Sequence, residues 1–238
     1  MLYLDNVSKS FGKKTVLHNI NAEFPERACS IIVGVNGSGK TTLLNIIAGL
    51  SSSSSGIISL NEYCEGSNEY KKRVFYIPSD FYLPDFMTGR EYARFVFSRY
   101  PRVDKERFSD IASAFDIDNA LDMLISSYSF GMKKKIQIAI ASCLDVDVLL
   151  IDEGLTGLDF ETTLLVQHLF SLLVRRMAIV LVTHDMDTVR CFPDSVFLLR
   201  NGRLESFSGH VNEIPKYVSM DGSYEEKIKL LEKCNYSS

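Results

Sequence analysis

Residues 34–42 contain the pattern that most limits what this chain can fold into. They read Gly-Val-Asn-Gly-Ser-Gly-Lys-Thr-Thr and match G-x-x-x-x-G-K-[ST] at every fixed position. A β-rich run at 29–33 precedes them, and a segment of helical character at 42–48 follows. We expect the loop between strand and helix to hold phosphate groups at the N-terminus of the helix.

Each residue type in this loop suits a polyphosphate. We expect Gly34, Gly37 and Gly39 to take positive φ angles, so that successive backbone N–H groups curl around phosphate oxygens. Lys40 supplies positive charge to the β- and γ-phosphates, and the Thr41 hydroxyl can ligate Mg²⁺. The alternative, a Gly/Ser turn that carries a lysine by chance, is disfavoured by the flanking strand and helix. The residues expected to bind a nucleoside triphosphate are Gly34, Asn36, Gly37, Ser38, Gly39, Lys40, Thr41 and Thr42.

Composition excludes several classes of protein. The 238 residues, 46% of them apolar and 24% charged, suit one domain or one domain with a lobe. A net charge of −4 argues against a nucleic-acid binder. We expect neither a signal peptide nor a membrane span, since no apolar run approaches about 18 residues. Four scattered histidines offer no metal cluster, and we expect reduced cytosolic thiols at Cys29, Cys64, Cys143, Cys191 and Cys234.

Hydrophobic periodicity divides the chain into strand-rich and helix-rich parts. The expected strands are 2–8, 15–24, 29–33, 57–60, 148–151, 178–182, 194–200 and 203–208, with a tight hairpin at Gly12–Lys14. The five serines at 51–55 indicate a solvated connection. The expected helices are 88–99 behind a Thr88 capping box, 104–116, 119–124, 132–144, about 160–175 and a short one from Asp185. This order indicates a helical insertion in a parallel-sheet nucleotide fold.

Two adjacent carboxylates follow the apolar strand at 148–151. A buried strand would deliver Asp152 to the carboxyl edge of the sheet, beside the phosphate loop, where it can hold Mg²⁺ through water. Glu153 faces differently and is placed to orient or deprotonate the water that attacks the γ-phosphate. A polar strand end without function is the alternative.

With these motifs in this order, the chain resembles the ATP-binding cassette (ABC) family over roughly residues 1–209. The family's signature segment has the form LSGGQ, and Tyr128–Met132 stands in its place. Ser129 and Gly131 are retained, while Phe130 replaces the first glycine. In the family, this segment reaches the ATP held by the opposite subunit. Separate-chain cassettes of bacterial exporters look similar, with Tyr-Ser-x-Gly-Met here.

The resemblance implies roles for five further positions. His184 matches the switch histidine that contacts the γ-phosphate, Asp159 the aspartate that lies across the dimer interface, and Phe11 the aromatic that stacks on adenine. A structural histidine and a hydrophobic hairpin residue are the alternatives for His184 and Phe11. Ser79 stands where the family has a glutamine that links Mg²⁺ to the membrane partner. Serine is shorter, so a bridging water or Asp80 must substitute, or the coupling is altered.

Two stretches of the part expected to be helical allow two interpretations each. The run Lys133–Lys135 is either a solvated basic edge or a site that attracts an anion, because three cations in a first helical turn oppose the helix dipole. Part of an aromatic-rich stretch belongs to the core, and the rest suits an exposed partner site. Its aromatic residues are Phe81, Tyr82, Phe86, Tyr92, Phe95, Phe97 and Tyr100.

The resemblance implies an α/β fold with a P-loop NTPase (RecA-like) core, an N-terminal antiparallel β subdomain and an inserted α-helical lobe at about 85–145. The cassette would span 1–210, and the tail 211–238 would carry a short docking helix, since Ser223–Glu226 is a capping box followed by apolar residues at helical spacing. The expected catalytic residues are Glu153, His184 and Lys40, and the expected metal ligands are Thr41, Asp152 and Ser79.

We therefore expect an ATPase subunit of a membrane exporter, using ATP and Mg²⁺. It would lie in the cytoplasm, held at the inner face of the membrane by a separate permease, and pair with a second cassette as a homodimer or heterodimer. One alternative is a soluble cassette ATPase acting on ribosomes or DNA. Another is a regulatory cassette with little turnover. A GTPase is disfavoured because no Asn-Lys-x-Asp motif occurs.

Overall fold

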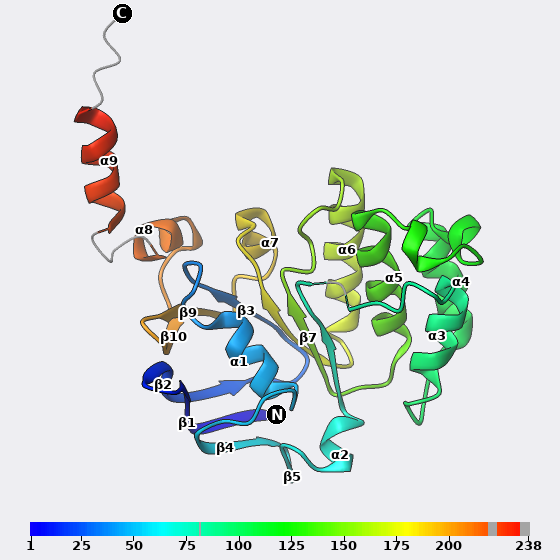
Figure 1. Ribbon diagram of the computed structural model, residues 1–238, viewed down its shortest axis with the longest axis horizontal. Helices are drawn as coiled ribbons and strands as arrows, with labels where there is room; N and C mark the ends of the chain where they lie inside the picture. The colour runs from blue at the N-terminus through cyan, green and yellow to red at the C-terminus, as the bar shows by residue number, and fades with distance from the viewer. Residues whose placement is uncertain (81, 219–222, 234–238) are drawn as a thin grey trace, which may run out of the picture.

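The computed structural model describes residues 1–80, 82–218 and 223–233, which form two sheets and a group of helices (Figure 1). The larger sheet has the order β10-β9-β3-β8-β7-β6. Neighbouring strands are parallel except for β10, which is antiparallel to β9. Its strands are β3 (Cys29–Val33), β6 (Val74–Ile77), β7 (Val148–Asp152), β8 (Ala178–Val182), β9 (Val196–Arg200) and β10 (Arg203–Phe207). The mainly parallel sheet is thus confirmed.

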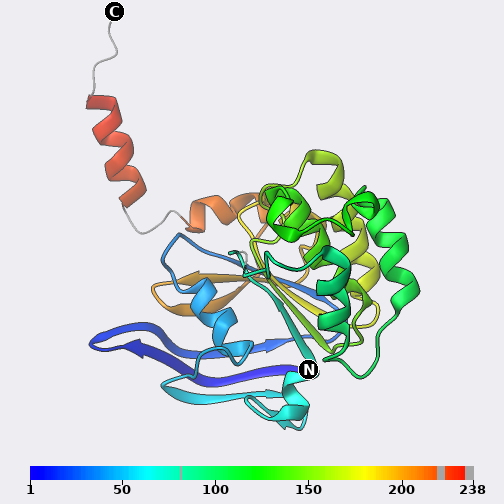
Figure 2. The ribbon, with the colours of Figure 1, turned by 45° about the vertical axis from the view of Figure 1, so that its right-hand side comes forward.

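The smaller sheet is antiparallel and has the order β2-β1-β4-β5. Its strands are β1 (Leu2–Phe11), β2 (Lys14–Phe24), β4 (Ser55–Leu60) and β5 (Tyr63–Cys64). The predicted hairpin is present: Phe11 pairs with Lys14 across a turn in which Gly12 has a φ of 57°. Figure 2 shows the long β1 and β2 strands as a layer beside the larger sheet.

The helical lobe, residues 85–145, contains α3, α4 and α5 and lies on one side of the larger sheet (Figures 1 and 2). Thr88 forms the predicted capping box with Glu91 at the start of α3. The helix expected at 119–124 is wrong, because this segment holds only short 3₁₀ turns at Asp118–Ala120 and Ile125–Ser127. The helices are α1 (Lys40–Ile47), α2 (Asn68–Lys71), α3 (Gly89–Phe97), α4 (Lys105–Ala114), α5 (Phe130–Cys143), α6 (Phe160–Leu173), α7 (Met186–Cys191), α8 (Ile214–Val218) and α9 (Ser223–Lys233).

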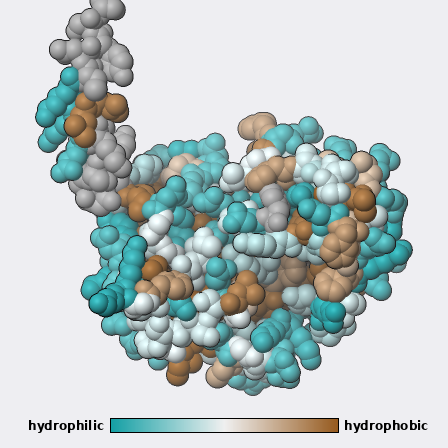
Figure 3. All heavy atoms as spheres, viewed as in Figure 1, coloured by the Kyte–Doolittle hydropathy of each residue, from teal (hydrophilic) through white to brown (hydrophobic). Residues whose placement is uncertain are grey.

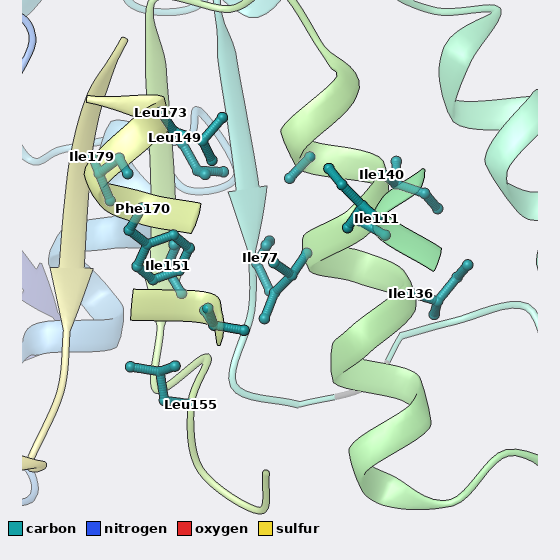
Figure 4. Packing of buried hydrophobic residues seen from close by; sticks show 14 of the residues in the cluster. Ile77, Ile111, Ile136, Ile140, Leu149, Ile151, Leu155, Phe170, Leu173 and Ile179 are labelled. Atoms are coloured by element: carbon teal, nitrogen blue, oxygen red, sulfur yellow. The ribbon is translucent and has the colours of Figure 1, made fainter. Parts of the chain in front are cut away.

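Alternation along the buried strands separates two hydrophobic clusters. In β7, Leu149 and Ile151 pack with the helical lobe and α6, whereas Val148 and Leu150 pack with α1 and the smaller sheet. Figure 4 shows Leu149 and Ile151 beside Phe170 and Leu173 of α6, with Ile136 and Ile140 of α5 further along the same cluster. Because side chains alternate along a strand, Asp152 continues the face of Leu150, toward α1.

The end of the chain departs in part from expectation. Residues of α8 pack on the last hairpin, where the Phe207 and Tyr217 rings lie 5.4 Å apart. The predicted tail helix is present as α9, but in Figures 1 and 2 it extends away from the rest of the molecule instead of docking. Among the described residues, no helix combines the length and apolarity that crossing a bilayer requires. The described cysteines are free, and Cys234 lies outside the described residues.

Candidate functional site

The cradle, residues 34–42, joins buried strand β3 to α1 as the sequence predicts. Gly37 and Gly39 have φ angles of 79° and 105°, in the region that only glycine adopts readily. Gly39 is the N-cap of α1, so the loop directs backbone N–H groups into the space before the helix. Asn36 is exposed and Thr42 half-buried at the two ends of this turn.

Gly34 requires a correction, since its φ angle is not in the positive region. A Cβ at this position would lie 2.3 Å from the Leu199 carbonyl oxygen and 2.8 Å from Ser38 Oγ. Glycine is needed at 34 because the backbone of β9 approaches the loop closely, not because of a left-handed turn.

Polar groups of the cradle suit an anionic ligand. Ser38 Oγ is buried and has no hydrogen-bond partner among the described residues, which is costly unless a ligand supplies one. Lys40 is 6% exposed and donates to the carbonyl oxygens of Gly34 at 2.7 Å and Val35 at 3.0 Å. Burial lowers the pKa of Lys40, and the carboxylates of Glu153 and Asp152 oppose that shift. The donors fit a triphosphate.

Thr41 and Asp152 meet across the site. Thr41 Oγ1 donates to Asp152 Oδ2 at 2.7 Å, which joins the first turn of α1 to the end of β7. Burial raises the pKa of Asp152, and the hydrogen bond from Thr41 acts against it. A hydroxyl and a carboxylate are the hard oxygen donors that Mg²⁺ takes when phosphates complete its shell, so the pair fits the ion. No group of three or more His, Cys, Asp or Glu side chains suited to a metal exists in the described parts.

Glu153 and His184 come from neighbouring strand ends. His184 Nε2 lies 3.3 Å from Glu153 Oε1. Glu153 has a φ of 50°, and its N–H donates to the Val182 carbonyl at 3.0 Å. This left-handed conformation interrupts the regular alternation of the strand directly after Asp152.

The signature segment, Tyr128–Met132, lies at the start of α5 in the helical lobe (Figure 1). Ser129 is exposed and caps α5, its Oγ accepting from Met132 N at 3.2 Å. Among the described residues, no hydrogen bond or ion pair joins Ser129 or Gly131 to the cradle.

Asp159 is engaged within its own chain. Its carboxylate caps α6, accepting from Thr162 N at 2.8 Å and from Thr162 Oγ1 at 2.7 Å. Phe11 is 55% exposed at the tip of the first hairpin, with Lys9 Nζ 4.9 Å from its ring centroid. It is therefore available for stacking and is not part of the core.

Ser79, where the glutamine was expected, is half-buried. Its backbone carbonyl accepts from Lys134 Nζ at 3.3 Å, and Asp80 is exposed. Sequence reasoning missed the burial of Lys134 because it treated the three lysines alike, without asking which side of the helix each one occupies. Most residues of α5 are buried, Lys134 among them. Tyr76, also missed, follows from the unpredicted strand β6. Burial is the main cause of its raised pKa, and the charge of the Asp152 carboxylate acts in the same direction.

The aromatic-rich stretch divides as expected. Phe97 is buried, whereas Tyr92 and Tyr100 are partly buried against the core. Tyr82 and Phe86 are 83% and 77% exposed, while Phe81 lies outside the described residues. Leu124, 49% exposed, belongs to the same lobe, and hydrophobic spheres gather over this lobe on the face shown in Figure 3.

Comparisons with known proteins agree with this geometry. A family model described as "ABC transporter" matches residues 17–156. A Nod factor export ATP-binding protein I of Burkholderia orbicola is 32% identical over 206 residues, covering 83% of this chain and 67% of that protein. A manganese transport system ATP-binding protein of Bacillus subtilis is 30% identical, with 82% of each chain covered. A solved ATP-binding subunit of an ABC transporter, 25% identical, superposes with a TM-score of 0.83 over 97% of this chain and 99% of that one.

Proposed function

Because the chain belongs to the ABC transporter family, whose cassettes bind and hydrolyse ATP, we propose that it powers export through a separate membrane permease. The observation that carries the proposal is the meeting of three segments, the cradle and the ends of β7 and β8, at one sheet edge. Thr41 lies 2.7 Å from Asp152, and Glu153 lies 3.3 Å from His184. Similar relatives include both an export and an import protein by name, so the direction belongs to the proposal.

Several side chains at this edge have the chemistry that hydrolysis needs. The Glu153 carboxylate takes a proton from the attacking water as the water oxygen bonds to the γ-phosphorus and the bond to the bridging oxygen breaks. His184 holds that carboxylate in place, and Lys40 balances charge on the phosphates. Thr41 and Asp152 would hold Mg²⁺, which neutralises phosphate charge when bound.

We assign each complete site to two chains, because Ser129 is exposed and neither Ser129 nor the half-buried Gly131 makes a hydrogen bond or ion pair to the cradle among the described residues. The likeness in fold to a dimeric cassette solved with ADP and Pi, at a TM-score of 0.77, is compatible with such a pairing. The test is coexpression of a Lys40→Ala chain with a differently tagged Ser129→Arg chain. One site of the mixed dimer then carries both defects and the other carries none.

The mixed dimer should hydrolyse ATP although each variant alone does not. A mixture as inactive as its components would contradict the two-chain site. The wild-type chain carrying both tags is the control for the tags themselves.

Exposed aromatic residues at the start of the helical lobe and just before it are the proposed contact with the permease. Tyr82 and Phe86 expose most of their rings, and large exposed apolar groups favour partner binding. Replacing both with serine should release the chain from the membrane fraction while the ATPase activity of the purified chain persists. The control is Leu50→Ser, which changes a 70% exposed residue outside the lobe. Equal retention of both variants would contradict this contact.

Direction can be tested with inside-out vesicles that contain the chain and its permease. Added ATP should cause a compound to accumulate in the lumen with the wild-type chain and not with Glu153→Gln. Depletion of a compound from the lumen would support import instead.

A further inference from the structure

The basic run Lys133–Lys135 at the start of α5 is not a solvated edge. Lys133 Nζ lies 3.2 Å from Asp85 Oδ1, and Lys135 Nζ lies 3.7 Å from Asp159 Oδ2. Lys134 Nζ donates to the carbonyl oxygens of Pro78 at 3.0 Å and Ser79 at 3.3 Å. The three lysines therefore connect one helix of the helical lobe to three different loops.

Lys134 differs from its neighbours because it is fully buried, with 0% of its surface exposed. Burying an ammonium costs several kcal/mol unless acceptors and opposite charges surround it. The two carbonyl oxygens are such acceptors, and the nearby carboxylates are those of Asp152, Glu153 and Asp80. Burial lowers the pKa of Lys134 and these carboxylates act in the opposite direction. The cation thus lies within the electrostatic field of the acid pair, Asp152 and Glu153.

Strand register explains why one side chain can reach both the loop and the acid pair. Ile77 of β6 pairs with Ile151 of β7, so Pro78 and Ser79 leave the sheet beside Asp152 and Glu153. Lys134 stands just over one helical turn after Ser129 on the same rigid helix. A displacement of Ser129 is therefore carried by α5 to the loop that follows β6.

We propose that Lys134 is a positioning residue for hydrolysis, tying α5 to the Pro78–Ser79 backbone so that the helical lobe sets the placement of this loop against the acid pair. This inference rests on the proposed function. It assigns to a lysine of the signature helix the link that the short Ser79 side chain does not make.

The experiment compares Lys134→Met with Lys133→Met in the purified chain. Methionine preserves the apolar stem of the lysine and removes the ammonium with its two carbonyl bonds. We expect Lys134→Met to lower kcat by about 10- to 100-fold with little change in the KM for ATP, since misplacement by about 1 Å has effects of this size. Lys133→Met, which alters a neighbouring ion pair on the same helix, should stay near the wild-type kcat.

A second readout follows the loop and not the activity. The chain contains no tryptophan, so Tyr82→Trp places a single tryptophan just after Ser79. Magnesium and ATP should shift its emission when Lys134 is present, and not in the Lys134→Met background, although ATP still binds. A lysine that only stabilised the fold would lower the melting temperature and leave this shift unchanged.

The outcomes distinguish failure of the proposed function from failure of the role proposed for Lys134. An inactive wild-type chain that fails to bind ATP would remove the proposed function itself. An active wild type with unchanged kcat and emission shift in Lys134→Met would overturn only the role of Lys134. If Lys134→Met does not fold, Lys134→Gln, which still has an N–H donor, replaces it in both measurements. Loss of fold in both variants would assign the lysine to stability alone and also overturn the proposal.

Discussion

The two halves of the candidate site differ in how completely they follow the expected pattern. In the core, the cradle and the acid pair keep every expected residue and meet through short contacts within one chain. In the helical lobe Phe130 departs from the pattern, as Ser79 does just before the lobe, and the signature segment lies apart from the cradle. Phosphate chemistry leaves little freedom in the first half. In the proposed function the second half contacts a partner, so its residues can vary with that partner.

The largest effect should come from the core. Glu153→Gln should slow ATP turnover by about 10²–10⁴-fold while nucleotide binding persists, because the amide cannot accept the proton of the attacking water. Steady-state phosphate release and equilibrium nucleotide binding check both parts. The control is Glu23→Gln, an exposed glutamate on β2. Undiminished turnover in Glu153→Gln would place the proton acceptor elsewhere.

Two glycines, one in each half, should respond differently to alanine. Gly34→Ala should destabilise the fold by about 3 kcal/mol or more, since its Cβ would meet the Leu199 carbonyl at 2.3 Å. Gly131→Ala should change stability by less than about 1 kcal/mol, because its Cβ would stay 3.4 Å from the Gly157 carbonyl. Urea denaturation without nucleotide measures both. Equal effects would remove the contrast between a crowded cradle and an open signature segment.

A contact between the halves gives the next effect. Gly157 has a φ of 82°, and a Cβ there would lie 2.4 Å from the Phe130 ring. Gly157→Ala should therefore destabilise the chain by about 1–3 kcal/mol, through both the ring clash and the left-handed backbone. Adding Phe130→Ala should restore the part due to the ring. Strictly additive effects in this double-mutant cycle would show that the ring does not occupy that space.

The smallest effect concerns pH in the protein without metal or nucleotide. Burial raises the folded-state pKa of Asp152 above its ordinary value of 3.8, so between the two values the folded state binds more protons than the unfolded state. Its contribution is present at low pH and is lost as pH rises through the folded pKa. The unfolding free energy of wild type minus that of Asp152→Asn should therefore fall as pH rises from 3.8. A difference that rises with pH would reverse the sign of this shift.

Sequence alone was sufficient where one local pattern determined one structure. The cradle, the buried strand before Asp152 and the Thr88 capping box each depend on neighbours in the chain, and all three are present. It failed where distant segments decide. Gly34 is required because β9 approaches it, Lys134 is buried because α5 is surrounded, and β6 has only four residues and ends at a proline. The segment 119–124 has helix-forming residues, yet tertiary contacts leave it as 3₁₀ turns.

The backbone of Glu153 has a consequence for how this protein can change. A non-glycine residue with a φ of 50° carries a conformational cost of about 1–2 kcal/mol, so the carboxylate is preorganised during folding and not when ATP arrives. Glycine or asparagine would relax that cost. The substitutions that relax the backbone at this position thus remove the proposed proton acceptor. Heat-resistant variants selected without a demand for turnover should accumulate changes at this residue.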